Sequence, residues 1–194
     1  MTARKNVCLY CASSSSIPQV YKDASAEVAR LCAKRGLCIL NGAGSAGIMG
    51  ITTDAALAEG GRVIGIIPQF MVDYGWCHSQ LSETIVTSDM ASRKQRFRDL
   101  SDGVIVLPGG CGTMEEFFET YTSRQLGLYN HPIIVLNTNG FYDCLKVWFQ
   151  RCLEEHFVHE EMRGMVVFAD TPEEAVDLFF TLPDRTGTIS NRSK

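Results

Sequence analysis

The segment of the chain best suited to chemistry is a glycine-rich turn, PGGCGT, at residues 108–113. It follows an apolar run, VIVL at 104–107, and leads into a helical pattern that begins MEE at 114–116. Glycine permits a close backbone approach that side chains block, and the N–H groups of a helix start can bind an anion. The turn lacks the lysine of a Walker loop, so it predicts a monophosphate site rather than a triphosphate site.

Glu116, at the end of this segment, has two compatible interpretations. Thr113 and Glu116 match a capping box, in which the threonine caps the helix and the glutamate folds back onto the helix start. Alternatively, Glu116 is a carboxylate that the positive helix end keeps ionised beside a bound phosphate, where it can face a developing cation. The spacing agrees with both.

A second charged side chain is predicted to point inward. The pattern over 89–101 predicts a helix with one apolar line, which runs through Met90, Phe97 and Leu100. Arg93 falls on this line and therefore needs an anionic partner. The alternatives are an ion pair with Asp89 at i, i+4, or a guanidinium that reaches water beyond its apolar stem. Arg96 and Arg98 are expected at the surface, whereas Lys94 adjoins Arg93 and can act with it.

Another glycine-rich loop, GAGSAG at residues 42–47, satisfies the G-x-G-x-x-G pattern of dinucleotide-binding folds. Such a site also requires an acidic residue at the end of the next strand, and here that strand ends GIIP at 65–68. We therefore expect no NAD, and we assign Gly42 and Gly44 to a wall of a nucleotide pocket. Ser13, in the loop after the first apolar run, is assigned to the same pocket, because ligands bind beyond the carboxyl ends of parallel strands.

The segment 68–81 has little regular pattern, although it contains Phe70, Met71, Tyr74 and Trp76. So much apolar area on a loop predicts a partner, which is either the base of a nucleotide or a second subunit. We favour the subunit.

These residues must be positioned by alternating strands and helices. Short apolar runs predict strands near 6–11, 37–41, 62–67, 83–87, 102–107, 132–136 and 165–168. Helical patterns fall near 18–35, 47–60, 89–101, 113–127, 141–156 and 172–181. Runs that are apolar throughout predict a parallel sheet buried on both faces. The sequence thus predicts an α/β fold, a doubly wound parallel sheet with helices on both faces, as one domain over 1–182 with a loose tail over 183–194.

Helix boundaries are also predicted. Ser16 is expected to cap the first helix, with Pro18 in its first turn, and Gly36 to end it; Thr171 is expected to cap the last helix.

Composition excludes several classes of protein. Of 194 residues, 45% are hydrophobic and 21% charged, which is ordinary globular usage, and the net charge of −4 argues against a nucleic-acid partner. We find neither a signal peptide nor a membrane span. The eight cysteines are scattered through apparent strands and helices, so we expect reduced thiols in the cytoplasm. His156 and His159 lack the i, i+4 spacing of a helical zinc pair, and we expect no metal site.

The nine residues PGGCGTMEE at 108–116 resemble the signature P-G-G-x-G-T-x-x-E of the LOG (Lonely Guy) family of cytokinin-activating phosphoribohydrolases, long labelled possible lysine decarboxylases. The similarity extends over about residues 5–180. It implies a Rossmann-like fold, usually dimeric, that converts N6-modified AMP, and often AMP, with water to the free base and ribose 5-phosphate. It implies no cofactor.

The resemblance also implies roles for individual residues. Arg93 and Glu116 correspond to the catalytic pair. The residues implied to surround the nucleotide are Lys94, Gly109, Gly110, Cys111, Gly112, Thr113, Met114, Glu115 and Thr122. Where the family commonly has M-H-E-R-K, this chain has Ala91 and Ser92 in place of the histidine and glutamate, which bears on substrate preference and rate.

Two function classes follow. The first is a hydrolase in which Glu116 stabilises oxocarbenium character at C1′ and positions a water, while the glycine turn holds the 5′-phosphate. The second is a nucleotide-binding or carrier protein of the same fold without hydrolytic activity. A pyridoxal decarboxylase would need a Schiff-base lysine in a cofactor pocket, which no feature of the sequence supplies.

Overall fold

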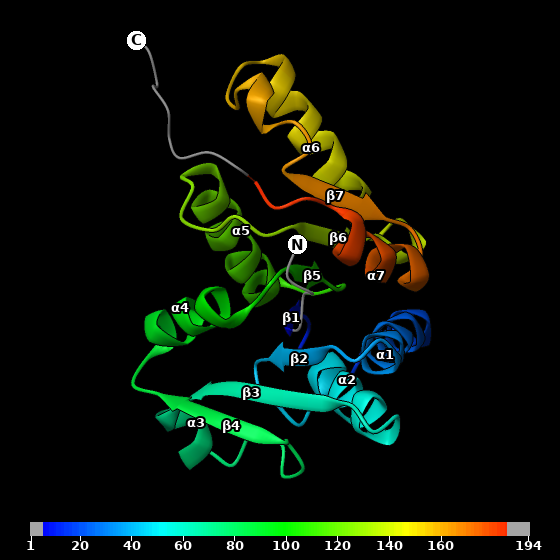
Figure 1. Ribbon diagram of the computed structural model, residues 1–194, viewed down its shortest axis with the longest axis vertical. Coiled ribbons are helices and arrows are strands. Elements are labelled where there is room, and N and C mark those ends of the chain that lie inside the picture. Colours follow the sequence, from blue (N-terminus) through cyan, green and yellow to red (C-terminus); the bar gives the residue numbers. More distant parts are fainter. Residues whose placement is uncertain (1–5, 186–194) are drawn as a thin grey trace.

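The computed structural model describes residues 6–185, and its centre is one seven-stranded sheet (Figure 1). All neighbouring strands are parallel, in the order β4-β3-β2-β1-β5-β6-β7. The strands are β1 (Asn6–Tyr10), β2 (Cys38–Asn41), β3 (Arg62–Pro68), β4 (Glu83–Thr87), β5 (Val104–Val106), β6 (Ile133–Leu136) and β7 (Val166–Ala169). The predicted parallel sheet is confirmed.

Helices connect consecutive strands. They are α1 (Gln19–Lys34), α2 (Gly47–Ala58), α3 (Gln69–Asp73), α4 (Met90–Leu100), α5 (Cys111–Gln125), α6 (Asp143–Glu154) and α7 (Pro172–Thr181), with short 3₁₀ turns at Thr138–Gly140 and Glu160–Met162. Six of the helices were predicted. The five-residue α3 was not, because one and a half turns carry too little periodicity to register in the sequence.

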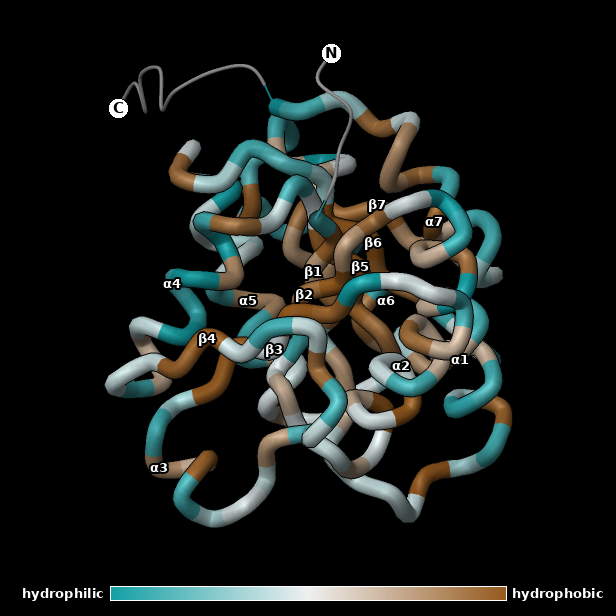
Figure 2. Tube along the Cα trace, turned by 60° about the horizontal axis from the view of Figure 1, so that its bottom comes forward, coloured by the Kyte–Doolittle hydropathy of each residue, from teal (hydrophilic) through white to brown (hydrophobic). Residues whose placement is uncertain are grey.

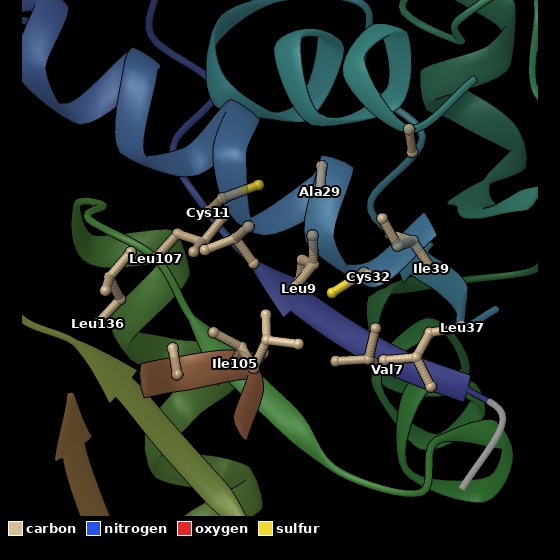
Figure 3. Close-up of a cluster of buried hydrophobic side chains, with 14 of the residues drawn as sticks. Val7, Leu9, Cys11, Ala29, Cys32, Leu37, Ile39, Ile105, Leu107 and Leu136 are labelled. Atoms are coloured by element: carbon tan, nitrogen blue, oxygen red, sulfur yellow. The ribbon is translucent and has the colours of Figure 1, made fainter. Parts of the chain in front are cut away.

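One face of the sheet packs against α1, α2 and α7, which lie together on the right of Figure 1. Alternate residues of the central strand, Val7 and Leu9, are almost fully buried here. Figure 3 shows them beside Ala29 and Cys32 of α1, which are also fully buried. Small residues on the helix let it approach the β-branched surface of the sheet closely.

The opposite face packs against α4, α5 and α6. The intervening residues of β1, Cys8 and Tyr10, join Phe97 of α4 and Phe117 of α5 in this second cluster. Figure 2 shows the result, with hydrophobic strands in the centre and mixed helices around them. Helices therefore cover both faces, and the doubly wound arrangement is confirmed.

The order of the strands defines where a ligand can bind. From β1 the chain adds β2, β3 and β4 on one side, and then returns to place β5 on the other side of β1. At such a switch point the loops after the two adjacent strands diverge, and they leave a crevice at the carboxyl edge of the sheet.

Helix boundaries agree with the sequence only in part. Gly36 follows α1 with a φ of +73°, and the Thr171 side chain accepts a hydrogen bond from the N–H of Glu174, both as predicted. The predicted Ser16 cap is wrong, because α1 begins at Gln19 with Pro18 at the cap position and no side-chain cap. Pro18 was expected in the first turn, but it stands one residue before it, where its fixed φ of −57° suits the entry into a helix.

The cysteines of the chain form no disulfide bonds. All eight cysteines are free, and Cys8 and Cys11 belong to the two opposite core clusters. No helix of the part described is long and apolar enough to cross a membrane. The start of the predicted loose tail is tied down, since the N–H of Arg185 donates to the carbonyl of Asn130 at 2.7 Å. Residues 186–194 lie outside the described part of the chain.

Candidate active site

A cleft of about 600 Å³ opens at the carboxyl edge of the sheet, at the switch point. Its volume suits a small organic ligand. It collects loops that follow β1, β2, β3 and β5, together with the first turns of α4 and α5. Ten residues assigned from sequence to the site line it: Ser13, Gly42, Gly44, Arg93, Gly110, Cys111, Gly112, Thr113, Glu115 and Glu116.

The centre of the cleft is an ion pair between α4 and α5. Nη1 of Arg93 donates to Oε1 of Glu116 at 3.0 Å, and the two side chains are only 8% and 12% exposed. Nε of Arg93 donates to the carbonyl of Ile66 on β3 at 2.9 Å, and the guanidinium lies 5.0 Å from the ring centre of Phe97. The predicted inward arginine is confirmed, and its anionic partner is Glu116.

Asp89 is not that partner. Its side chain accepts a hydrogen bond of 2.7 Å from the N–H of Ser92 and so caps the start of α4. The cap fixes the first turn of the helix that carries Arg93.

Gly42 provides the space that Arg93 occupies. A Cβ at this position would overlap Nη2 of the Arg93 guanidinium, and it would also crowd the sulfur of Met49. The first glycine of the G-x-G-x-x-G loop therefore serves the approach of an arginine, rather than that of a dinucleotide pyrophosphate.

Burial dominates the electrostatics of Glu116. Loss of water raises its pKa to about 7, and the neighbouring Arg93 acts in the opposite direction without cancelling the effect. The carboxyl group therefore titrates in the range in which a group can exchange protons at neutral pH.

The predicted capping box is wrong. Helix α5 begins at Cys111, with Gly110 at the cap position, so Thr113 is the third helical residue and Glu116 the sixth. A carboxylate at the sixth position is beyond the free N–H groups of the helix start, and Glu116 turns instead to Arg93.

The glycine turn leaves the start of α5 open. No side chain caps this helix, and a Cβ on Gly110 or Gly112 would meet no atom within 4 Å. Gly109 differs, because a Cβ there would overlap the Thr113 side chain, which is itself buried. Uncapped N–H groups beside open space are suited to an anionic ligand.

Four residues assigned from sequence do not line the cleft: Lys94, Gly109, Met114 and Thr122. Lys94 forms ion pairs with Glu115 and Glu119, Met114 packs on the second core cluster, and Thr122 is exposed on α5. Their roles in binding stay predictions.

The sequence did not reveal the apolar part of the lining. It consists of Leu9, Met49, Ile67, Met71, Trp76 and Met90. Trp76 is held at the rim, because its carbonyl accepts a hydrogen bond of 3.1 Å from the N–H of Ser45 in the glycine loop, and it stacks on Tyr74 at 5.3 Å. For the segment 68–81 the sequence left a base or a second subunit as alternatives and favoured the subunit. Met71 and Trp76 of this segment line the cleft, whereas Phe70 and Tyr74 do not. Trp76 also keeps half of its surface exposed, as Phe70 and Tyr74 do.

Comparison with known proteins identifies the family. Residues 49–179 match a family model described as "Possible lysine decarboxylase". The chain is 35% identical over 173 residues to the probable cytokinin riboside 5′-monophosphate phosphoribohydrolase LOGL3 of Oryza sativa subsp. japonica, covering 89% of this chain and 82% of the relative. It is 36% identical over 172 residues to cytokinin riboside 5′-monophosphate phosphoribohydrolase LOG5 of Arabidopsis thaliana, covering 89% and 75%. The chain belongs to the LOG family.

Solved structures similar to this LOG family member share its fold. The molybdenum cofactor binding protein from the phototrophic bacterium Rippkaea orientalis superposes with a TM-score of 0.70 at 20% identity, covering 92% of this chain and 96% of that protein. The molybdenum cofactor carrier protein from Chlamydomonas reinhardtii gives 0.69 at 18% identity, covering 90% and 94%. At these identities the likeness shows the Rossmann-like fold alone.

Proposed function

We propose that this LOG family member hydrolyses the N-glycosidic bond of a nucleoside 5′-monophosphate, either AMP or N6-modified AMP, to the free base and ribose 5-phosphate. One observation carries the proposal, namely a buried arginine–glutamate pair that opens into a cleft beside an uncapped helix start. The relatives at about 35% identity are named as enzymes that act on such compounds.

The reaction assigns a task to each part of the cleft. The N–H groups at the start of α5 bind the 5′-phosphate, and this fixes the ribose next to Glu116. As the bond from C1′ to the base nitrogen breaks, its electron pair leaves with the base and positive charge develops on the sugar. The Glu116 carboxylate stabilises this charge and accepts a proton from the water that adds to C1′. The base departs and takes up a proton from bulk water, and Glu116 returns its proton to bulk water, so that one water is consumed overall.

The apolar side of the cleft, which includes Met71 and Trp76, binds the base. The phosphate site follows β5 and the wall with Met71 and Trp76 follows β3, three strand spacings away across β1 and β2. At about 4.8 Å per spacing this is roughly 14 Å, close to the length of a nucleoside monophosphate. A flat apolar base and an apolar N6 substituent both fit such a lining.

We also propose a cellular compartment and an oligomeric state for the enzyme. Eight free cysteines suit a reducing cytoplasm. The exposed Phe70 and Tyr74 beside the edge strand β4 favour a homodimer. We assign no partner among nucleic acids or membranes.

The test is to incubate the protein with AMP, N6-modified AMP and adenosine, and to measure free base and ribose 5-phosphate. We expect release from the monophosphates, a much lower kcat/KM for adenosine because it lacks the anion, and full activity in EDTA because Arg93, Glu116 and backbone groups suffice. Binding of AMP without release of base would favour the carrier alternative. Equal kcat/KM for AMP and adenosine would contradict the phosphate site.

A further inference from the structure

His78, two residues after Trp76, has both of its ring nitrogens engaged. The N–H of Gln80 lies 3.2 Å from Nδ1, and Nε2 lies 3.1 Å from Oδ1 of Asp54 on α2. Because a backbone N–H can only donate, Nδ1 is the acceptor, and Nε2 carries the hydrogen that is donated to Asp54. The imidazole is only 9% exposed. His78 therefore joins the segment that carries Trp76 to α2 through one defined tautomer.

The apolar wall of Met71 and Trp76 has little burial of its own. No residue of the short helix α3, which includes Met71, is buried, and Trp76 is 53% exposed. The wall is instead fastened to the glycine loop after β2. The N–H of Ser45 donates to the carbonyl of Trp76 at 3.1 Å, and the N–H of His78 donates to the carbonyl of Ala43 at 2.8 Å. The position of the wall thus depends on hydrogen bonds more than on a packed core.

Asp54 is a rigid anchor for these contacts. It lies in α2 between Thr53 and Ala55, both of which are buried against the sheet. Its own carboxylate is 66% exposed, and a carboxylate so well hydrated needs no partner for its own stability. The consequence of the pair is therefore to be sought on the side of His78, whose buried Nε2–H requires an acceptor.

We propose that His78 and Asp54 are positioning residues that hold the apolar wall of Met71 and Trp76 in place for the base of the nucleotide. Neither residue lines the cleft, so both act through the wall. The inference rests on the proposed function and deepens it, because it separates recognition of the base from recognition of the phosphate. The phosphate site at the start of α5 is built from another part of the chain and does not depend on the pair.

AMP and ribose 5-phosphate differ by the base alone and therefore separate the two kinds of recognition. We expect Asp54→Ala to raise the Kd for AMP by about tenfold, because the Nε2–H of His78 loses its acceptor and the wall moves. The Kd for ribose 5-phosphate should stay within about twofold of the wild type. In turnover, KM for AMP should rise with a smaller change in kcat.

His78→Ala should reproduce this selective defect. The double variant Asp54→Ala/His78→Ala should be no worse than either single variant, because one interaction can be lost only once. Asp54→Ala changes an exposed side chain and is expected to fold, so it decides the question alone if His78→Ala does not fold.

Two conservative variants test the hydrogen bond against simple filling of space. The amide nitrogen of glutamine can take the place of Nε2, whereas the amide oxygen of asparagine can take only that of Nδ1. We expect His78→Gln to keep the Kd for AMP within about threefold of the wild type, and His78→Asn to be as defective as His78→Ala. Equal defects in the glutamine and asparagine variants would contradict a role for the bond to Asp54.

Trp76 itself can report the position of the wall. The chain has two tryptophans, and Trp148→Phe, on α6 and outside the lining of the cleft, leaves Trp76 as the single emitter. Saturating AMP should shield Trp76 from quenching by acrylamide, and the shielding should be weaker when Asp54→Ala is added. Ribose 5-phosphate should shield Trp76 in neither protein, because it does not reach the wall.

His131→Ala is the matched control. Nδ1 of His131 lies 3.1 Å from Oδ1 of Asp184, so the variant also breaks a histidine–aspartate pair, but one that precedes β6 at the opposite edge of the sheet from the cleft. We expect its Kd for AMP within about twofold of the wild type. An equal loss of AMP affinity in His131→Ala, or an Asp54→Ala defect of equal size for AMP and ribose 5-phosphate, would overturn the proposal.

Failure of the proposed hydrolysis remains distinguishable from failure of this inference. Wild-type protein that binds AMP more tightly than ribose 5-phosphate but releases no base would refute the hydrolysis, while calorimetry and Trp76 fluorescence would still decide the role of the pair. Base release together with unchanged AMP binding by Asp54→Ala would refute the inference and leave the hydrolysis standing.

Discussion

Arg93 and Glu116 form one buried ion pair at the centre of the cleft. The guanidinium is almost fully buried, and a buried cation requires an anion; the carboxyl group loses most of its hydration in the same place. Removing one member of such a pair leaves the other as an unpaired buried charge, which typically lowers the free energy of unfolding by about 3–5 kcal/mol. For Glu116 itself, burial outweighs the attraction of Arg93, so the ionised carboxylate that the proposed chemistry needs is held at a cost to stability.

Glu116→Gln tests the carboxylate. The amide keeps the size of the side chain but loses the charge that stabilises a cationic sugar, so kcat should fall on the order of 100-fold or more. AMP should still bind, because the phosphate site is separate. Stopped-time assays of base release and calorimetry measure the two effects.

Glu59→Gln serves as the control, since Glu59 pairs with Lys34 beyond the far end of α2. Near-normal turnover of Glu116→Gln would require the mechanism to be rebuilt around another residue.

The pH dependence follows from the raised pKa of Glu116, about 7. If the carboxylate is the active form, kcat/KM should fall tenfold per pH unit below about pH 7, and the residual activity of Glu116→Gln should lack this limb. The charged or titratable groups around Glu116 are Arg93 and Lys94 from α4, Glu115 from α5, Cys8 and Tyr10 from β1, and Cys11 directly after β1.

Stability should change in the opposite direction. Because the folded pKa lies above the ordinary value of 4.5, protonated Glu116 favours the folded state. This contribution is complete below about pH 4.5 and is lost as the pH rises through 7. The Tm of Glu116→Gln relative to the wild type should therefore increase between pH 5 and 8. A difference in Tm that is flat across this range would contradict the raised pKa.

At the scale of elements, two glycines that line the cleft have opposite roles. Gly42 makes room for a protein side chain, whereas Gly112 in the first turn of α5 faces open space. A glycine is required at position 42 because the Arg93 side chain packs against it, whereas the space beside Gly112 is available to a ligand.

Substitution by alanine distinguishes these roles. Gly42→Ala should displace the Arg93 guanidinium, lower the free energy of unfolding by about 1–3 kcal/mol and abolish most activity. Gly112→Ala should leave the Tm unchanged or slightly higher, because alanine favours a helix, but should weaken AMP binding by crowding the phosphate. Thermal melts and binding measurements on both variants provide the check; strong AMP binding by Gly112→Ala would move the phosphate elsewhere.

The same elements show what the sequence predicts and what it does not. The apolar line of α4 predicts that Arg93 points inward, because periodicity alone sets a helix face. It does not identify Glu116 as the partner, since that contact depends on how α4 and α5 cross. The start of α5 was misplaced by two residues because a threonine followed by a glutamate imitates a cap, while the actual start at Cys111 leaves its N–H groups to a ligand. Lys94 was expected at the nucleotide because it adjoins Arg93 and because the family resemblance implies it. Its ion pairs with Glu115 and Glu119 were not foreseen, since these residues are distant in sequence.

For the whole molecule, one group of exposed apolar residues lies beside an edge of the sheet (Figure 1). Phe70 and Tyr74 lie near the edge strand β4, where Val86 is also exposed. An edge strand flanked by exposed apolar side chains is a site for association.

We therefore expect a particle of twice 21.5 kDa in sedimentation. Tyr74→Ser combined with Phe70→Ser should shift the equilibrium toward the monomer. Phe157→Ser, which changes an even more exposed residue after α6, should not. A wild-type protein that sediments as a monomer at micromolar concentration would contradict the proposed dimer.

The central position of β1 also governs the order in which the molecule can be completed during synthesis. Strands β1 to β4 can pair as soon as they leave the ribosome, but the other edge of β1 pairs with β5, and Glu116 follows later still. Until then the nascent chain exposes the unpaired apolar edge of β1, and Arg93 lacks its partner Glu116. Translation that pauses between α4 and α5 should therefore expose the chain to aggregation and to chaperones, and activity should appear only after the second half-sheet has docked.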